Sequence, residues 1–82
     1  MQYMVVSNYS GEKTYASLEE AVQAIKKEVQ EQALVAYESD QIDKYAFEDI
    51  MWDIEGCIKF NMAFQHDDLP YYWDIKELKG GN

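Results

Sequence analysis

Residues 17–37, SLEEAVQAIKKEVQEQALVAY, decide the arrangement of the rest of the chain, because they predict one long amphipathic helix. Ser17 and Glu20 have the Ser-x-x-Glu spacing of a capping box, whose side chains bind free N–H groups of a first helical turn. A short strand over residues 33–38, ALVAYE, is the alternative that this apolar run leaves open. Apolar residues recur at helical steps, namely Leu18, Ala21, Val22, Ile25, Val29, Ala33 and Ala36.

The N-terminal residues predict a strand that the helix can cover. Residues 2–7, QYMVVS, are rich in β-branched and aromatic side chains, and the turn-prone segment NYSGE follows them. Both alternating faces of this strand are apolar, which favours a place inside a sheet rather than at its bare edge.

A second helix is expected after the first, with Ser39 or Asp40 as its N-cap and an end near Glu55. Gly56 then stands where a left-handed C-terminal cap is wanted. Two further strands are predicted by alternation, separated by the turn QHDDLP at residues 65–70. Their apolar residues are Ile58, Phe60, Met62 and Phe64 in the first, and Tyr71, Trp73 and Ile75 in the second.

These elements predict an α+β fold of order β-α-α-β-β, in which two helices cover one face of a three-stranded, mainly antiparallel sheet. A chain of 82 residues closes one modest core, so we expect a single domain over residues 1–82. Residues 79–82 are expected to form a flexible tail.

The charge balance is the most unusual feature of the composition. Sixteen acidic residues face seven lysines and no arginine, which gives a formal net charge of −9. Direct binding of nucleic acid is not expected, because it requires cations that displace counterions from phosphate. The excess of acid favours a basic partner, and solubility of a small protein is the alternative explanation.

The single Cys57 excludes an internal disulfide, and the sequence MQYMVVSN lacks the features of a signal peptide. We therefore expect a cytoplasmic protein, in the host cytosol if a phage encodes it. No apolar run approaches the roughly 18 residues of a membrane span, so no membrane partner is expected.

The segment FEDIMWDIEG, residues 47–56, places a tryptophan among four carboxylates. At about 100° per residue, Phe47, Ile50, Met51 and Ile54 share the face that meets the sheet. The opposite arc predicts a partner-binding surface, made of Tyr45, Glu48, Asp49, Trp52, Asp53 and Glu55. The alternative is that Trp52 folds back over the first helix or over Tyr37 and belongs to the core.

The predicted hairpin carries a second acidic and aromatic group. Asp67, Asp68 and Asp74 lie in or beside it, interleaved with tyrosines and Trp73. If the hairpin lies next to the second helix, these three acids extend the partner-binding surface. The alternative is a polar turn beside a strand with one buried face.

No enzyme, metal site or cofactor is expected from the motifs. Cys57 and His66 are a weak nucleophile and base pair, and Asp49 with Asp53 lacks the cleft that acid–base catalysis needs. One His, one Cys and no spaced ligand motif exclude a structural zinc site of recognised form, and the calcium loop of EF-hands is absent.

The segments ESDQIDKYAFEDIMWDIEG and HDDLPYYWD, together with the lack of arginine, resemble the small acidic anti-defence proteins of bacteriophages. These include anti-CRISPR and anti-restriction proteins that mimic DNA. The resemblance implies a stoichiometric inhibitor, monomeric or homodimeric, of a basic nucleic-acid-binding protein such as a nuclease or CRISPR effector. An immunity protein or antitoxin against a ribonuclease is an alternative, as is a homodimeric structural or assembly protein.

Overall fold

The computed structural model describes the backbone of residues 2–78 and the side chains of residues 2–56 and 62–78. The predicted tail at residues 79–82 and the side chain of Cys57 therefore lie outside the described residues. In chain order the elements are β1 (Gln2–Ser7), β2 (Gly11–Tyr15), α1 (Leu18–Glu38), α2 (Lys44–Asn61), β3 (Ala63–Gln65) and β4 (Tyr72–Leu78).

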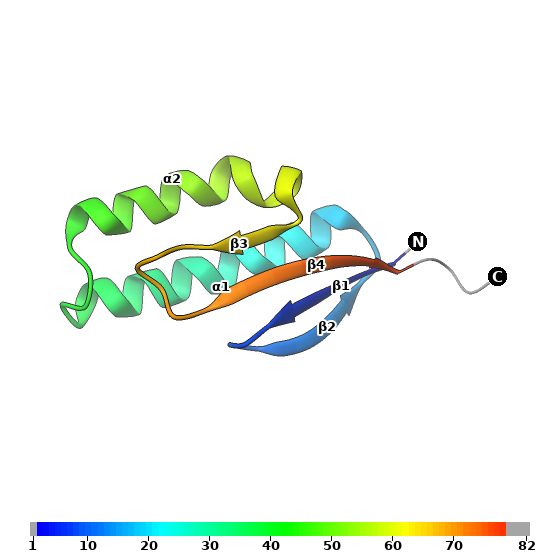
Figure 1. The fold of residues 1–82 in the computed structure, drawn as a ribbon, viewed down its shortest axis with the longest axis horizontal. Coiled ribbons are helices and arrows are strands. Elements are labelled where there is room, and N and C mark those ends of the chain that lie inside the picture. The colour runs from blue at the N-terminus through cyan, green and yellow to red at the C-terminus, as the bar shows by residue number, and fades with distance from the viewer. Residues whose placement is uncertain (1, 79–82) are drawn as a thin grey trace.

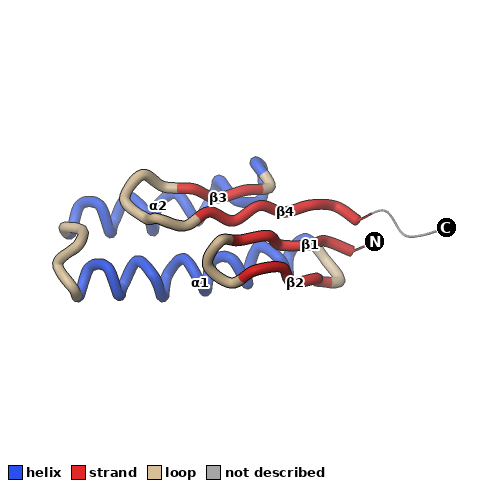
Figure 2. The backbone as a smooth tube through the Cα atoms, turned by 60° about the horizontal axis from the view of Figure 1, so that its bottom comes forward, coloured by secondary structure: helices blue, strands red, loops and turns tan. Residues whose placement is uncertain are grey.

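The four strands form one antiparallel sheet in the order β2-β1-β4-β3. Both helices lie against one face of this sheet, with α1 along β1 and β2 and α2 beside β3 (Figures 1 and 2). The α+β class and the two-layer arrangement are confirmed. The predicted position of the first strand is also confirmed, because β1 is paired on both sides, with β2 and β4.

The prediction of three strands is wrong, because residues 11–15, GEKTY, form the additional strand β2. Residues 8–10 make the predicted turn, and Gly11 begins the strand with a positive φ of 81°. Four of the five residues of β2 are exposed. An edge strand with so little apolar surface lacks the alternation that marks a half-buried strand, and its pairing with β1 decides its structure.

The first helix follows its prediction closely. The hydroxyl of Ser17 accepts a hydrogen bond from the backbone N–H of Glu20 at 3.1 Å, and the Glu20 carboxylate accepts one from the N–H of Ala16 at 3.1 Å. The helix continues to Glu38, so a separate strand over residues 33–38 is not formed. Its buried side chains are those of the predicted stripe, namely Ala21, Val22, Ile25, Val29, Ala33 and Ala36.

The start of α2 differs from the prediction. Asp43 caps this helix, since its carboxylate accepts a hydrogen bond from the N–H of Ala46 at 2.8 Å. Ser39 instead closes α1, donating its backbone N–H to the carbonyl of Val35 at 3.0 Å, and Asp40 turns the chain with a φ of 63°. Several cap residues stand in this segment, so the sequence alone leaves the choice among them open.

The end of α2 is also corrected, because the helix passes through Gly56 and ends at Asn61. Ile50, Ile54 and Ile58 follow one another at helical steps of four, and this period prevails over the alternation that predicted a strand from Ile58. Met62 then takes the left-handed position, with a φ of 56°, and its carbonyl accepts the N–H of Ile75 at 2.7 Å.

The C-terminal hairpin is confirmed in a shorter form. β3 pairs antiparallel with β4, placing Phe64 opposite Trp73, and the predicted turn lies between the two strands. Along β4, Trp73 and Ile75 are buried while Tyr72 and Asp74 are exposed, as the alternation predicts. Within the described part of the chain, neither helix combines the length and the hydropathy that a bilayer crossing demands.

Candidate functional site

The inner side of α2 packs on the sheet and on α1, as the helical wheel predicts. Ile50 and Ile54 are fully buried, and Phe47 and Met51 are half-buried. This packing fixes the rotation of the helix, and so it also fixes which side chains face solvent.

Two aromatic side chains, Tyr45 and Trp52, project furthest from the outer side of α2, and the line through them is called the crest below. Tyr45 and Trp52 are each 80% exposed. The alternative in which Trp52 folds back into the core is therefore not realised. Tyr37, over which Trp52 would fold in that alternative, packs instead against Phe47, with ring centroids 5.1 Å apart and ring planes tilted by 32°.

Glu48 and Glu55 lie on the side of the crest that faces α1. Glu48 is 4.0 Å from the ammonium of Lys44, and Glu55 is 3.9 Å from that of Lys26 on α1. Both carboxylates remain largely exposed, at 60% and 70% of the side-chain surface. Ion pairs of this length and exposure contribute little to stability, so the carboxylates are free to change partners.

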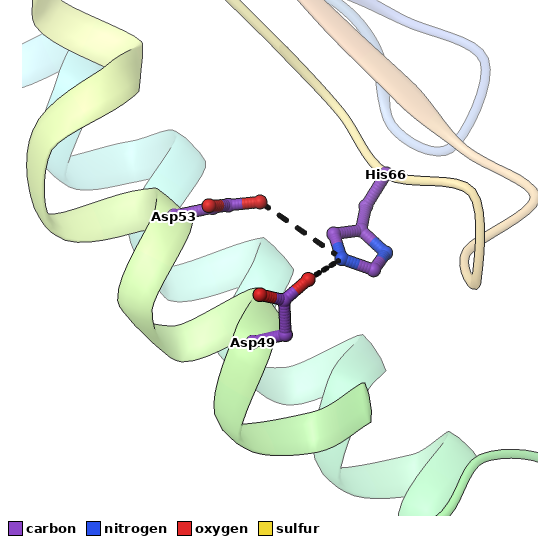
Figure 3. Close-up of side chains that lie close together, drawn as sticks. All are labelled: Asp49, Asp53 and His66. Carbon is purple, nitrogen blue, oxygen red and sulfur yellow. Dashed lines mark hydrogen bonds and ion pairs between the residues drawn. The ribbon is translucent and has the colours of Figure 1, made fainter. Parts of the chain in front are cut away.

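Asp49 and Asp53 lie on the opposite side of the crest, where His66 reaches them from the loop after β3 (Figure 3). The Nε2 atom of His66 is 2.8 Å from one oxygen of Asp49 and 3.9 Å from one oxygen of Asp53. Only 9% of the His66 side chain is exposed. The backbone N–H of Asp68 donates to Nδ1 at 3.1 Å, which orients the ring toward α2.

A shallow hollow of about 600 Å3 lies between the first turn of α2 and the loop at residues 66–70. Three carboxylates line it, from Asp43, Asp49 and Asp68, and the Tyr45 ring stands at its side. The remaining lining residues are Gln41, Ile42 and Ala46. Its shape and charge suit the end of a lysine or arginine side chain.

The three acids of the hairpin are placed differently from one another. Asp68 joins the α2 surface, because it lines the hollow and its carboxylate is 3.7 Å from Nδ1 of His66. Asp67 is exposed in the same loop. Asp74 lies on β4 between the buried Trp73 and Ile75, so its side chain is on the sheet face opposite the helices and away from α2.

Asp43 was not singled out from the sequence, and His66 was considered only as a weak base beside Cys57, not as a partner of Asp49 and Asp53. The spacing of four between Asp49 and Asp53 already indicates one helix face. No pattern in the neighbouring sequence indicates that His66, 17 residues after Asp49, contacts that helix face. The contact depends on where α2 ends.

Comparisons of this chain with protein-family models, with curated proteins and with solved structures found no match. What the outer face of α2 does is therefore inferred from its own shape, charge and chemistry.

Proposed function

We propose that this protein is a non-catalytic binding module that inhibits a basic, nucleic-acid-binding protein, with a CRISPR effector or another defence nuclease as the first class of target. The observation that carries the proposal is the 80% exposure of both Tyr45 and Trp52 between carboxylates of one helix. Large aromatic side chains that stay in solvent forgo the free energy of burial, and a partner that covers them recovers it.

The spacing of the two rings suits one continuous interface. Tyr45 and Trp52 are seven residues apart, which places them two turns and about 10 Å apart along the same side of the helix. Tyrosine and tryptophan are enriched among the few interface residues that carry most of the binding energy. The two rings therefore act as anchors, and the acids around them select the partner.

The charge of the protein selects a basic partner. With a net charge of −9, it attracts positive surfaces over a distance set by salt, which raises the rate of encounter. On contact, arginine forks of the partner replace the long ion pairs that Lys44 and Lys26 make with Glu48 and Glu55. The hollow between Asp43, Asp49 and Asp68 receives a further cationic side chain.

Inhibition follows from competition for the same cations. A protein that holds DNA or RNA does so with lysines and arginines that contact phosphates, spaced about 1.7 Å per charge along a duplex. Glu48, Asp49, Asp53 and Glu55 lie within about 10.5 Å along the helix axis, which is roughly half the charge density of a duplex. When this face occupies the basic groove, nucleic acid is excluded from it.

The proposal is tested with purified, guide-loaded CRISPR nucleases, each incubated with the protein before target DNA is added. We expect cleavage to fall in proportion to the amount of added protein, until one equivalent is bound. Trp52→Ala is expected to weaken inhibition by roughly thirtyfold, which corresponds to about 2 kcal/mol of binding energy for a central interface residue.

Two charge variants separate a specific face from total charge. One variant changes Glu48, Asp49 and Asp53 to their amides, and its control changes Glu12, Glu31 and Glu38 to glutamine, so both lose three negative charges. We expect only the first to lose inhibition. Equal loss in both variants contradicts an interface on α2.

Two further results would contradict the proposal. The first is unimpaired cleavage by every nuclease tested, including ribonuclease toxins, which probe the related role of an immunity protein. The second is a homodimer in solution that Trp52→Ala converts to monomer, because the face would then be covered by a second copy of the chain.

A further inference from the structure

We propose that Asp49, Asp53 and His66 bind one divalent transition-metal ion, for which Zn2+ is the probe. The inference does not rest on the proposed inhibition, although both use Asp49 and Asp53, because it depends on how α2 meets the loop after β3. Two carboxylates on successive turns of the helix point at one nitrogen of a nearly buried imidazole (Figure 3).

The three ligand atoms already stand close to metal-binding geometry. Nε2 of His66 is 2.8 Å from Asp49 and 3.9 Å from Asp53, and one atom from each of the three residues lies within 4.8 Å of the others. Ligands about 2.0–2.1 Å from a tetrahedral zinc ion are about 3.3 Å apart. The two observed separations lie on both sides of that value, so the ligand atoms must shift, and the hydrogen bond from the Asp68 N–H to Nδ1 must be released, before all three reach one ion.

The local charge favours a bound cation. Asp49 and Asp53 are four residues apart on a helix, a spacing at which like charges destabilise, and Asp68 adds a third carboxylate 3.7 Å from the ring. Among the described side chains, no lysine ammonium lies within ion-pair distance of these three carboxylates. A divalent ion neutralises the two ligating aspartates and leaves the imidazole uncharged.

The ligand types select the ion. An imidazole nitrogen with two carboxylate oxygens suits Zn2+ and its neighbours Co2+, Ni2+ and Mn2+, whereas Mg2+ and Ca2+ prefer oxygen ligands only. Asp49 and Asp53 keep 64% and 38% of their side-chain surfaces exposed, so further positions on the ion remain open to water.

Metal binding requires a change of tautomer at His66. In the arrangement described, Nδ1 accepts the N–H of Asp68, so Nε2 carries the ring proton and donates it to Asp49. To ligate through Nε2, the neutral ring must carry its proton on Nδ1 instead. The carboxylate of Asp68 is at hand to accept that Nδ1–H, as carboxylates do beside metal-bound histidines.

The test is titration of the folded protein with Zn2+ by calorimetry, and with Co2+ by its visible absorption. A Cys57→Ser background is used throughout, so that the thiol is not a ligand. We expect one ion per chain, a rise in the thermal midpoint with ion concentration, and no binding of Mg2+ or Ca2+ at the same concentrations.

Variants assign the ligands. His66→Asn, Asp49→Asn and Asp53→Asn are each expected to weaken Zn2+ binding at least about tenfold, and Asp68→Asn by about 10- to 100-fold through its contact with the ring. Asp67→Asn removes the same charge from the same loop and is expected to bind Zn2+ like the wild type. Because His66 is nearly buried, its variant is checked for folding by circular dichroism, and the exposed aspartates decide the matter if it unfolds.

Three outcomes overturn the proposal. They are the absence of stoichiometric Zn2+ binding, equal loss of affinity in Asp67→Asn and Asp53→Asn, and binding that needs none of the three ligands. Loss of nuclease inhibition is not part of this test, so failure of one proposal leaves the other standing.

Discussion

The tripeptide Trp-Asp-Ile occurs twice, at residues 52–54 in α2 and at residues 73–75 in β4, with opposite outcomes for the tryptophan. Trp52 is 80% exposed, whereas Trp73 is fully buried, and the isoleucine is buried in both places. In a helix, residues two apart lie on nearly opposite sides, and in a strand they share a face. The same tripeptide therefore exposes its tryptophan when it is helical and buries it when it is in a strand.

The two indoles also differ in their surroundings. Trp73 is ringed by Tyr9, Phe64 and Tyr71, with centroids 6.1–6.4 Å away, and its Nε1–H donates to Glu28 at 3.0 Å. The core is thus built around Trp73. Trp52 lies on the face that we propose as a binding surface, where 80% of it is exposed.

The largest effect is expected from Trp73→Ala. Removing the largest fully buried side chain leaves a cavity between the sheet and α1, and we expect a loss of about 3–5 kcal/mol in the free energy of unfolding. Urea denaturation followed by circular dichroism measures it. A change below 1 kcal/mol would show that Trp73 is not central to the core.

An intermediate effect is expected from Glu28→Ala, which leaves the buried indole N–H of Trp73 without its acceptor. Unsatisfied buried donors cost about 1–3 kcal/mol, and we expect a destabilisation in that range by the same denaturation method. Glu28→Gln keeps an acceptor oxygen and loses the long contact with Lys13, 54% of whose side chain is exposed. If the glutamine variant is as unstable as the alanine variant, the hydrogen bond is not the cause.

The smallest effect on stability is expected from Trp52→Ala, within about 0.5 kcal/mol of the wild type, because the side chain packs little. Variants that keep only one tryptophan test the difference in burial directly.

In Trp73→Phe, acrylamide should quench the remaining Trp52 emission readily. In Trp52→Phe, the Trp73 emission should be protected, and equal quenching of both would contradict their different burial.

Much of the fold was predictable where one periodic signal stood without a competitor. The stripe of α1 and its Ser17 cap, the inner and outer faces of α2, and the alternation of β4 all appear as predicted. Errors fall where two signals compete or none exists. Cap residues crowd residues 39–43, two periods overlap at Ile58, and β2 carries almost no apolar pattern.

The candidate site divides in the same way. Tyr45 and Trp52 were predictable, because the rotation of α2 follows from its apolar stripe. The contact of His66 with Asp49 was not, since it depends on the end of the helix and on the tight turn at Met62. Asp74 shares the composition of the surface but faces the other side of the sheet, which its place in β4 determines.

By itself, the sequence determined that this chain folds as an α+β domain, that α2 presents an acidic and aromatic outer face, and that the chain carries a net charge of −9. Side-chain periodicity follows from the order of the residues and net charge from the composition, so neither requires knowledge of tertiary contacts. Only the tertiary structure decided the fourth strand, the hydrogen bond from the Trp73 indole to Glu28, and the contact of His66 with Asp49 and Asp53. These depend on hydrogen bonds and packing between residues far apart in sequence, which no local pattern records.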